Sequence, residues 1–239
     1  MKRFLIVITV ALMLSPAVFA QQAEPAEERR QYTIEELYLS QDVELQIIRS
    51  QALSENREMK LLALQSIRSM IQSGALTEDN PSLFIVLESL ATEGTGRRVT
   101  TGGSRVMNNY PDIRREAAGL LGEIGGERSK QVLLTILRDD PEPMVLSEAV
   151  YALGLIGIND ENEVTNHVAR VLSRQTIQPA PDNNLAFASL LAIERMAVAS
   201  GGISDPAVID ALLEVASGNY IREVRLKAID VISRLRGRT

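Results

Sequence analysis

Apolar and small residues recur along the chain with the spacing of one face of an α-helix. Five positions start this pattern: Met59, Ile113, Val145, Leu185 and Val224. From each start, apolar or small residues stand four, seven, eight and eleven residues further on. A period of 3.6 residues predicts an amphipathic helix at each place. The residue four positions on is always small, which lets a neighbouring helix approach closely: Ala63, Ala117, Ala149, Ser189 and Ala228.

A second apolar stripe follows four of the five predicted helices. Its members are Leu83, Val86, Leu87 and Leu90; Val132, Leu133, Ile136 and Leu137; Val164, Val168, Val171 and Leu172; and Val208, Ile209, Leu212 and Leu213. Glycine pairs such as Gly125-Gly126 and Gly201-Gly202 separate neighbouring stripes. The pattern therefore predicts pairs of helices joined by short turns.

The small residues are spaced 54, 32, 40 and 39 positions apart. A unit of about 32 to 40 residues is typical of solenoids built from helical pairs, in which each unit buries its apolar face only by stacking on the next. We expect N-terminal cap helices at 33–55, then repeats at 56–91, 111–140, 141–175 and 181–217. An insertion loop at 92–110 explains the longest spacing, and a terminal half-repeat occupies 219–239.

Two helices are predicted within the cap segment 33–55. Thr33 to Glu36 has the spacing of a capping box, which opens the first of them. Ser40 is the expected cap of the second, whose apolar residues are Val43, Ile47 and Ile48.

The segment PDIRREAAGLLGEIG at 111–125, followed by a second apolar helix and Asp139-Asp140-Pro141, resembles the short bacterial form of the HEAT repeat, also called HEAT-like or phycobilisome-lyase-like. The resemblance is strongest over 111–157, recognisable at 219–235 and degenerate at 56–91 and 184–216. It implies an all-α, right-handed α-solenoid that takes part in protein–protein interaction. It brings no catalytic residues with it.

The first 20 residues have the order of a secretory signal peptide. Lys2 and Arg3 precede the apolar run 4–14, and Val18-Phe19-Ala20 fits a cleavage site. We expect cleavage after Ala20, a flexible polar leader at 21–32, and a soluble periplasmic or secreted protein. The alternative is an uncleaved membrane anchor. The chain has no Cys, which excludes a lipoprotein, thiolate catalysis and Cys-based metal sites.

Charge and composition narrow the function further. Without its first 20 residues the chain has 23 Lys and Arg against 31 Asp and Glu, which disfavours nucleic-acid binding. The single histidine, His167, has no second His or Cys with which to bind a metal, so we expect it at the edge of the core. We expect no cofactor and no enzymatic activity.

Three groups of residues are candidates for binding a partner. Arg97, Arg98 and Arg105 in the insertion, with Arg114 and Arg115 beyond it, form a positive element for an acidic partner segment or a phosphate-bearing ligand; the alternative is a mobile loop without function. A groove on the second helix of repeat 2 would present Lys130, Gln131, Thr135 and Arg138. Leu226 and Ile229, among basic residues, would bind a partner or a second copy, unless the basic stems simply cover them.

These observations predict a non-enzymatic scaffold or adaptor of the bacterial cell envelope that binds another protein. One alternative is a bilin-lyase-like or other enzyme of the same repeat family. Another is a passive structural protein of the cell wall.

Overall fold

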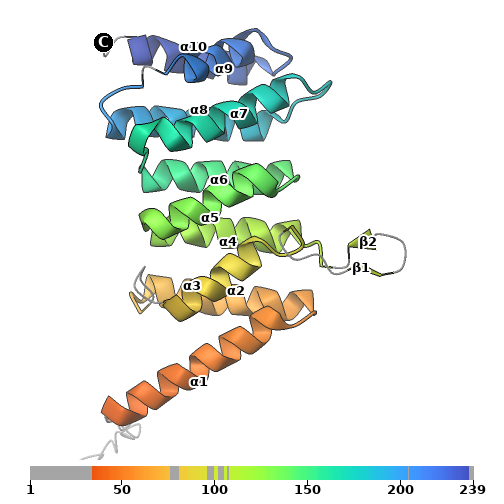
Figure 1. Cartoon of the computed structure of the whole chain (residues 1–239), viewed down its shortest axis with the longest axis vertical. Coiled ribbons are helices and arrows are strands. Elements are labelled where there is room, and N and C mark those ends of the chain that lie inside the picture. The colour runs from red at the N-terminus through yellow and green to blue at the C-terminus, as the bar shows by residue number, and fades with distance from the viewer. Residues whose placement is uncertain are drawn as a thin grey trace, which may run out of the picture.

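The computed structural model describes residues 34–75, 81–95, 100–101, 105–106, 108–203 and 205–236. Within them the chain forms an elongated stack of helices (Figure 1). The expected signal peptide at 1–20 and leader at 21–32 lie outside the described residues. Among the described helices, none has both the length and the apolar character needed to cross a bilayer.

The helices are α1 Ile34–Leu53, α2 Arg57–Gln72, α3 Pro81–Ala91, α4 Pro111–Ile124, α5 Gly126–Asp139, α6 Pro143–Ile156, α7 Glu163–Thr176, α8 Asn183–Ala199, α9 Pro206–Ser217 and α10 Arg222–Arg236. A 3₁₀ turn, η1, covers Asp160–Asn162. The short strands β1 Thr100–Thr101 and β2 Arg105–Val106 pair in antiparallel register, with Thr100 opposite Val106.

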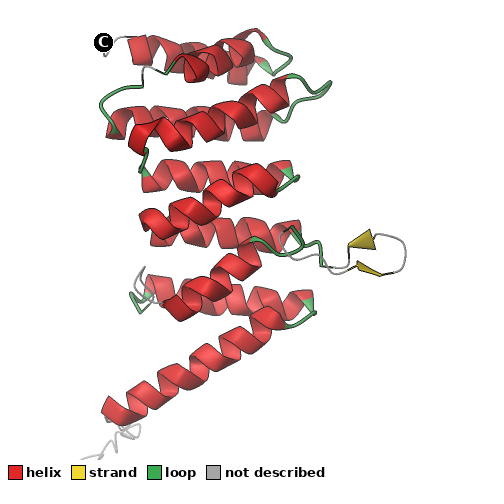
Figure 2. Cartoon of the chain, viewed as in Figure 1, coloured by secondary structure: helices red, strands yellow, loops and turns green. Residues whose placement is uncertain are grey.

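The helices form two rows (Figures 1 and 2). The even-numbered helices α2 to α10 stack on one another in chain order, and the odd-numbered helices lie along one side of that stack. The prediction of an all-α solenoid is confirmed. The described strands belong only to the insertion between α3 and α4, and they project to one side of the stack (Figure 2).

The predicted helix faces form the core. The five small residues four positions after each start are completely buried, as are most members of the second stripes. Leu213 differs, because 46% of its surface is exposed, and Ile209 is only partly buried. In α9 the core positions are instead Val208, Ala211, Leu212 and Val215.

The pairing of helices differs from the predicted units. Each odd helix packs more extensively on the even helix that follows it than on the one before it, so the pairs are α1 with α2, α3 with α4, and so on to α9 with α10. The segment expected to be a terminal half-repeat therefore has a packed partner, since α10 lies against α9.

The prediction of two cap helices is wrong. α1 runs without a break from Ile34 to Leu53, and Ser40 lies inside it. No Gly or Pro occurs between these bounds, so nothing in the sequence ends the first helix at that point. Ile48 is buried against the array, whereas Val43 and Ile47 are more than half exposed.

Glycines set how closely the even helices stack. A Cβ on Gly122 of α4 would lie 2.7 Å from Ala152 Cβ of α6, and one on Gly154 of α6 would lie 2.8 Å from Ala192 Cα of α8. The corresponding residues are Arg68 in α2 and Glu194 in α8, and there the helices are joined by ion pairs instead. Arg68 meets Glu116 at 3.2 Å, and Glu194 meets Lys227 at 2.7 Å. The middle of the stack is thus the most closely packed part.

Candidate protein-binding site

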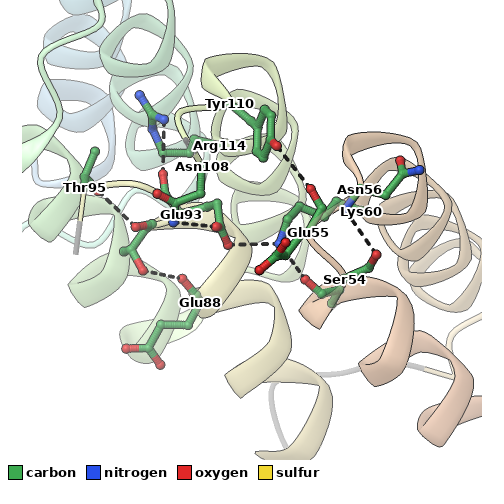
Figure 3. Close-up of polar contacts among 12 residues, drawn as sticks. Ser54, Glu55, Asn56, Lys60, Glu88, Glu93, Thr95, Asn108, Tyr110 and Arg114 are labelled. Atoms are coloured by element: carbon green, nitrogen blue, oxygen red, sulfur yellow. Dashed lines mark hydrogen bonds and ion pairs between the residues drawn. The ribbon is translucent and has the colours of Figure 1, made fainter. Parts of the chain in front are cut away.

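The two ends of the insertion meet in a polar cluster that we call the neck, formed by Glu93, Gly94, Asn108 and Asn109 (Figure 3). Asn108 Nδ2 donates to Glu93 Oε1 at 2.8 Å. Gly94 has φ +75°, and a Cβ there would lie 2.3 Å from the carbonyl oxygen of Asn108. This close approach requires a glycine, and it closes the insertion where it leaves the stack.

Two buried cations tie the neck to the helices. Lys60 Nζ of α2 contacts Glu93 Oε2 at 3.1 Å and donates to Ala52 O of α1 at 2.8 Å. Arg114 Nη1 of α4 donates to Glu93 O at 3.1 Å and to Asn109 Oδ1 at 2.9 Å. The buried side chains of Lys60 and Arg114 therefore fix the neck to α1, α2 and α4.

Arg114 is not available to a partner, so its assignment to the binding surface is wrong. Its side chain has no exposed surface, and its Nε meets Asp140 Oδ2 at 2.6 Å while Nη2 donates to Asp140 Oδ1 at 3.2 Å. Together with the bonds to Glu93 and Asn109, this bidentate pair engages four of the five N–H donors of the guanidinium. Arg114 positions the neck and the turn after α5.

The remaining arginines of the insertion have different outcomes. Arg97 and Arg98 lie outside the described residues. Arg105 belongs to β2, where only its backbone is placed. Arg115, on α4, is exposed as expected and is close enough to Glu148 of α6 to oppose the burial that raises the pKa of that carboxyl.

A second candidate site is a groove of about 500 Å³ along the odd-numbered helices, which we call the basic groove. It is formed by the end of α5, the outer face of α7 and the start of α9. Its lining residues are Leu137, Arg138, Asn166, His167, Ala169, Arg170, Ser173, Arg174 and Ala207. They include three arginines and no acidic residue, although the chain as a whole has a net charge of −6.

The arginines of the basic groove differ in how they are held. Arg174 Nη2 donates to Leu137 O at 2.9 Å, which fixes it across the α5–α7 junction. Arg138 is exposed and contacts its neighbour Asp139 at 3.1 Å. Arg170 is exposed on the next turn of α7. An exposed ion pair such as Arg138 with Asp139 is weak, so it leaves Arg138 able to bind another carboxylate.

His167 lines the basic groove and is partly buried, in line with its expected place at the edge of the core. Burial lowers the pKa of its imidazole, Arg170 acts in the same direction, and Glu163 opposes them. Burial thus favours the neutral imidazole of His167, which adds a hydrogen-bonding group to the groove. Within the described residues, no group of His, Asp and Glu has the arrangement of a metal site.

The other groove residues predicted on α5 are only partly correct. Lys130 is 3% exposed and pairs with Glu127 and Glu163, each at 2.9 Å, so its assignment to the exposed face is wrong. Gln131 is exposed and Thr135 is partly exposed, but neither lines the basic groove. Only Arg138 of the predicted set does so. Arg170 and Arg174 were missed because the helix rotation of α7 relative to α5 is not visible in the sequence.

Leu226 and Ile229 lie on the outer side of α10, as expected, with about half of each side chain exposed. The basic residues around them divide into two groups. Lys227 and Arg234 pair with Glu194 of α8, whereas Arg222 and Arg225 are exposed.

Comparison with known families identifies the repeat. Residues 106–180 match a family model described as HEAT repeats, which confirms the resemblance over the segment from β2 to the end of α7. That segment includes most of the basic groove and both residues of the Arg114–Asp140 pair. No curated protein matches the chain.

Proposed function

Because residues 106–180 form HEAT repeats, which commonly mediate protein–protein interaction, we propose that this protein is a non-enzymatic scaffold that binds another protein through the surface of its solenoid. An extended stack of helices offers a long open surface to a partner. Its place of action, in this proposal, is the bacterial cell envelope, and it reaches that place by means of the predicted signal peptide at 1–20.

The basic groove is the observation that carries the proposal. Arg138, Arg170 and Arg174 converge there from two helices. The carboxylates beside the groove are Asp139, which pairs with Arg138 at an exposed position, and Glu214, which accepts a hydrogen bond from Ser173. Guanidinium groups bind carboxylates in a planar, two-point geometry. The partner is therefore a protein with an acidic segment. Leu226 and Ile229 on α10 form a separate surface, which in this proposal meets a second copy of the chain.

Binding of a labelled glutamate-rich peptide, followed by fluorescence anisotropy, tests the groove directly. We expect binding to the full-length protein that weakens steeply as salt is added, because exposed charges are screened. Arg170→Glu should lose at least about tenfold in affinity, since it removes one attractive charge and adds a repulsive one. A lysine-rich peptide should not bind.

The matched control is Arg49→Glu, which makes the same change of charge at an exposed residue of α1, far along the chain from the groove. Its affinity for the acidic peptide should stay close to that of the unchanged protein. Equal losses in the two variants would show that only net charge matters and would overturn the groove as the site.

The cellular location needs its own test. Fractionation of cells, with N-terminal sequencing of the purified protein, should recover a chain that starts at Gln21 in the envelope fraction. A chain that retains residues 1–20 in the cytoplasm would contradict export and would favour the enzymatic alternative.

A further inference from the structure

Both ends of the even-numbered row keep an apolar residue where the other helices of the row have a neighbour. We count positions from the five pattern starts Met59, Ile113, Val145, Leu185 and Val224. Five residues after the first four of these starts stand Leu64, Ala118, Val150 and Leu190, all with no exposed surface. The equivalent residue of α10 is Ile229, which is 50% exposed, because no described even helix follows α10. α10 therefore retains the apolar stacking position without a helix to cover it.

The opposite end shows the complementary feature. Three residues after each pattern start, the side chain reaches the preceding even helix, as Glu116 does to Arg68 and Lys227 does to Glu194. In α2 this position is Leu62, which is 45% exposed, because no described even helix precedes α2. An apolar residue thus faces outward at each end of the row.

We propose that a second copy of this chain stacks head to tail on the first, with α2 of one copy lying on α10 of the other. The junction repeats the packing that already joins α2 to α4, α4 to α6 and the later helices of the row. Ile229 and Leu226 of one copy then cover Leu62 of the second copy. This inference concerns the ends of the stack, so it stands or falls independently of an acidic partner in the basic groove.

An ion pair inside the molecule shows how the charges would align. At the junction of α2 with α4, Arg57 pairs with Asp112; these residues stand two and one positions before the pattern starts of their helices, Met59 and Ile113. In α10 the residue two positions before the start is Arg222, and in α2 the residue one position before the start is Glu58. Both are exposed. Stacking α2 on α10 brings Arg222 to Glu58 of the second copy.

The residues at the point of closest approach also fit. In the middle of the stack, Gly122 meets Ala152 and Gly154 meets Ala192. Each glycine stands nine positions after the pattern start of its helix, and each alanine stands seven positions after its own. The residues at these positions in the new junction are Ser233 of α10 and Ser66 of α2. Both are small, but each carries a Cβ, so the new junction is spaced more widely than the glycine contacts between α4, α6 and α8. Its spacing resembles that of the junctions of α2 with α4 and of α8 with α10, which also lack a glycine contact.

Charge favours this arrangement over a symmetric contact between two α10 helices. Among the described side chains of α10, the exposed charged residues are Arg222, Glu223, Arg225 and Arg234. A symmetric contact places this surface against its own copy and so brings together two surfaces with more positive than negative charge. The head-to-tail contact instead joins a basic surface to Glu58. Because it joins two different surfaces, it leaves a free end on each side and allows chains of more than two copies.

Sedimentation velocity of the full-length protein over a range of concentrations tests the proposal. We expect the mean mass to rise with concentration beyond that of a dimer. Ile229→Asp blocks the α10 end, and Leu62→Asp blocks the α2 end, so each variant alone should remain a monomer. About half of each side chain is exposed, so neither change should unfold the protein. Leu155→Asp, at a half-exposed residue of α6, is the matched control and should associate normally.

Mixing the two blocked variants gives the decisive result. Each retains the surface that the other lacks, so an equal mixture should form a dimer and nothing larger. Failure of the mixture to associate would overturn the proposal, as would a monomeric unchanged protein at every concentration. Association of Leu62→Asp alone would show a symmetric contact through α10 instead.

The ion pair has a separate test. Arg222→Glu should weaken association on the order of fivefold at low salt, since an exposed pair contributes little. Adding Glu58→Arg to the same chain should restore it by reversing both charges. No recovery in the double variant would contradict the alignment of α2 on α10.

Discussion

At the scale of single residues, the buried pair of Arg114 and Asp140 holds together parts of the chain that are distant in sequence. Arg114 contacts the neck on one side and Asp140 on the other, and Asp140 Oδ1 also accepts a hydrogen bond from the backbone of Glu142. A buried ion pair contributes modest net stability, but removal of one partner leaves an uncompensated charge. The pair therefore makes the turn after α5 sensitive to substitution.

Asp140→Ala should lower the free energy of unfolding by about 3–5 kcal/mol, because Arg114 would remain buried without its partner. Urea denaturation followed by circular dichroism measures the change. Asp139→Ala is the control, since Asp139 is exposed and contacts only Arg138 in the described structure. A similar loss in both variants would contradict the special role of Asp140.

Gly122→Ala should destabilise the protein by about 1–3 kcal/mol, because its Cβ would overlap Ala152 of α6 and force the two helices apart. Gly119→Ala, in the same helix, meets only the flexible Glu148 carboxylate at 3.3 Å. It should be neutral or stabilising, by up to about 1 kcal/mol, because Ala favours a helix. Thermal unfolding of both variants distinguishes the two environments, and equal effects would contradict the close-contact account.

Sequence patterns predicted which apolar residues are buried better than they predicted which charged residues are exposed. Period alone placed the small residues correctly in the core. Arg114 and Lys130 were assigned to the surface because most cations are exposed. Their burial depends on Asp140, in the turn after α5, and on Glu163 of α7. Periodicity along one helix carries no information about such distant partners.

At the scale of elements, the insertion combines a short pair of strands with a neck that its own ends build. The neck joins Glu93 to Asn108, and Glu93 in turn to Lys60 of α2 and Arg114 of α4. The sequence identified the insertion by its Gly and Arg content and by the extra spacing. The neck was missed, because Lys60 and Glu93 are 33 residues apart and neither belongs to a recognisable motif.

Gly94→Ala should open the neck, since the added Cβ would meet the backbone of Asn108 and the residue would also be strained at positive φ. Hydrogen exchange should speed up at residues 93–95 and 108–110 while the rest of α4 stays protected. Gly74→Ala is a close control, because Gly74 has φ +74° and no neighbour within 4 Å. Faster exchange at the neck in this control would contradict the role of the close approach.

At the scale of the whole molecule, the stack is closely packed in the middle and joined by ion pairs near its ends. Each helix touches only its neighbours in the array, so stability is distributed along the stack and not concentrated in one central core. The repeat spacing was sufficient to predict this architecture. The pairing of odd with even helices was not predicted, because the same spacing fits either choice of partner.

Hydrogen exchange should therefore be graded along the array. Amides of α4, α6 and α8 should exchange slowest, and those of α10 faster, since α10 is joined to α8 by Glu194 with Lys227 and Arg234 and not by a glycine contact. Lys227→Met should speed up exchange in α10 and leave α4 and α6 unchanged. Uniform acceleration over all helices would show that the stack unfolds as one unit.

The neck has a consequence for how this protein can change over evolutionary time. Its described bonds join Glu93 and Asn109 to buried groups in α2 and α4, and Asn108 to Glu93. We therefore expect substitutions, additions or deletions in the stretch between Thr95 and Asn108 to leave these bonds intact. Natural selection, or a protein engineer, can thus exchange the enclosed sequence for another recognition element without rebuilding the stack that carries it.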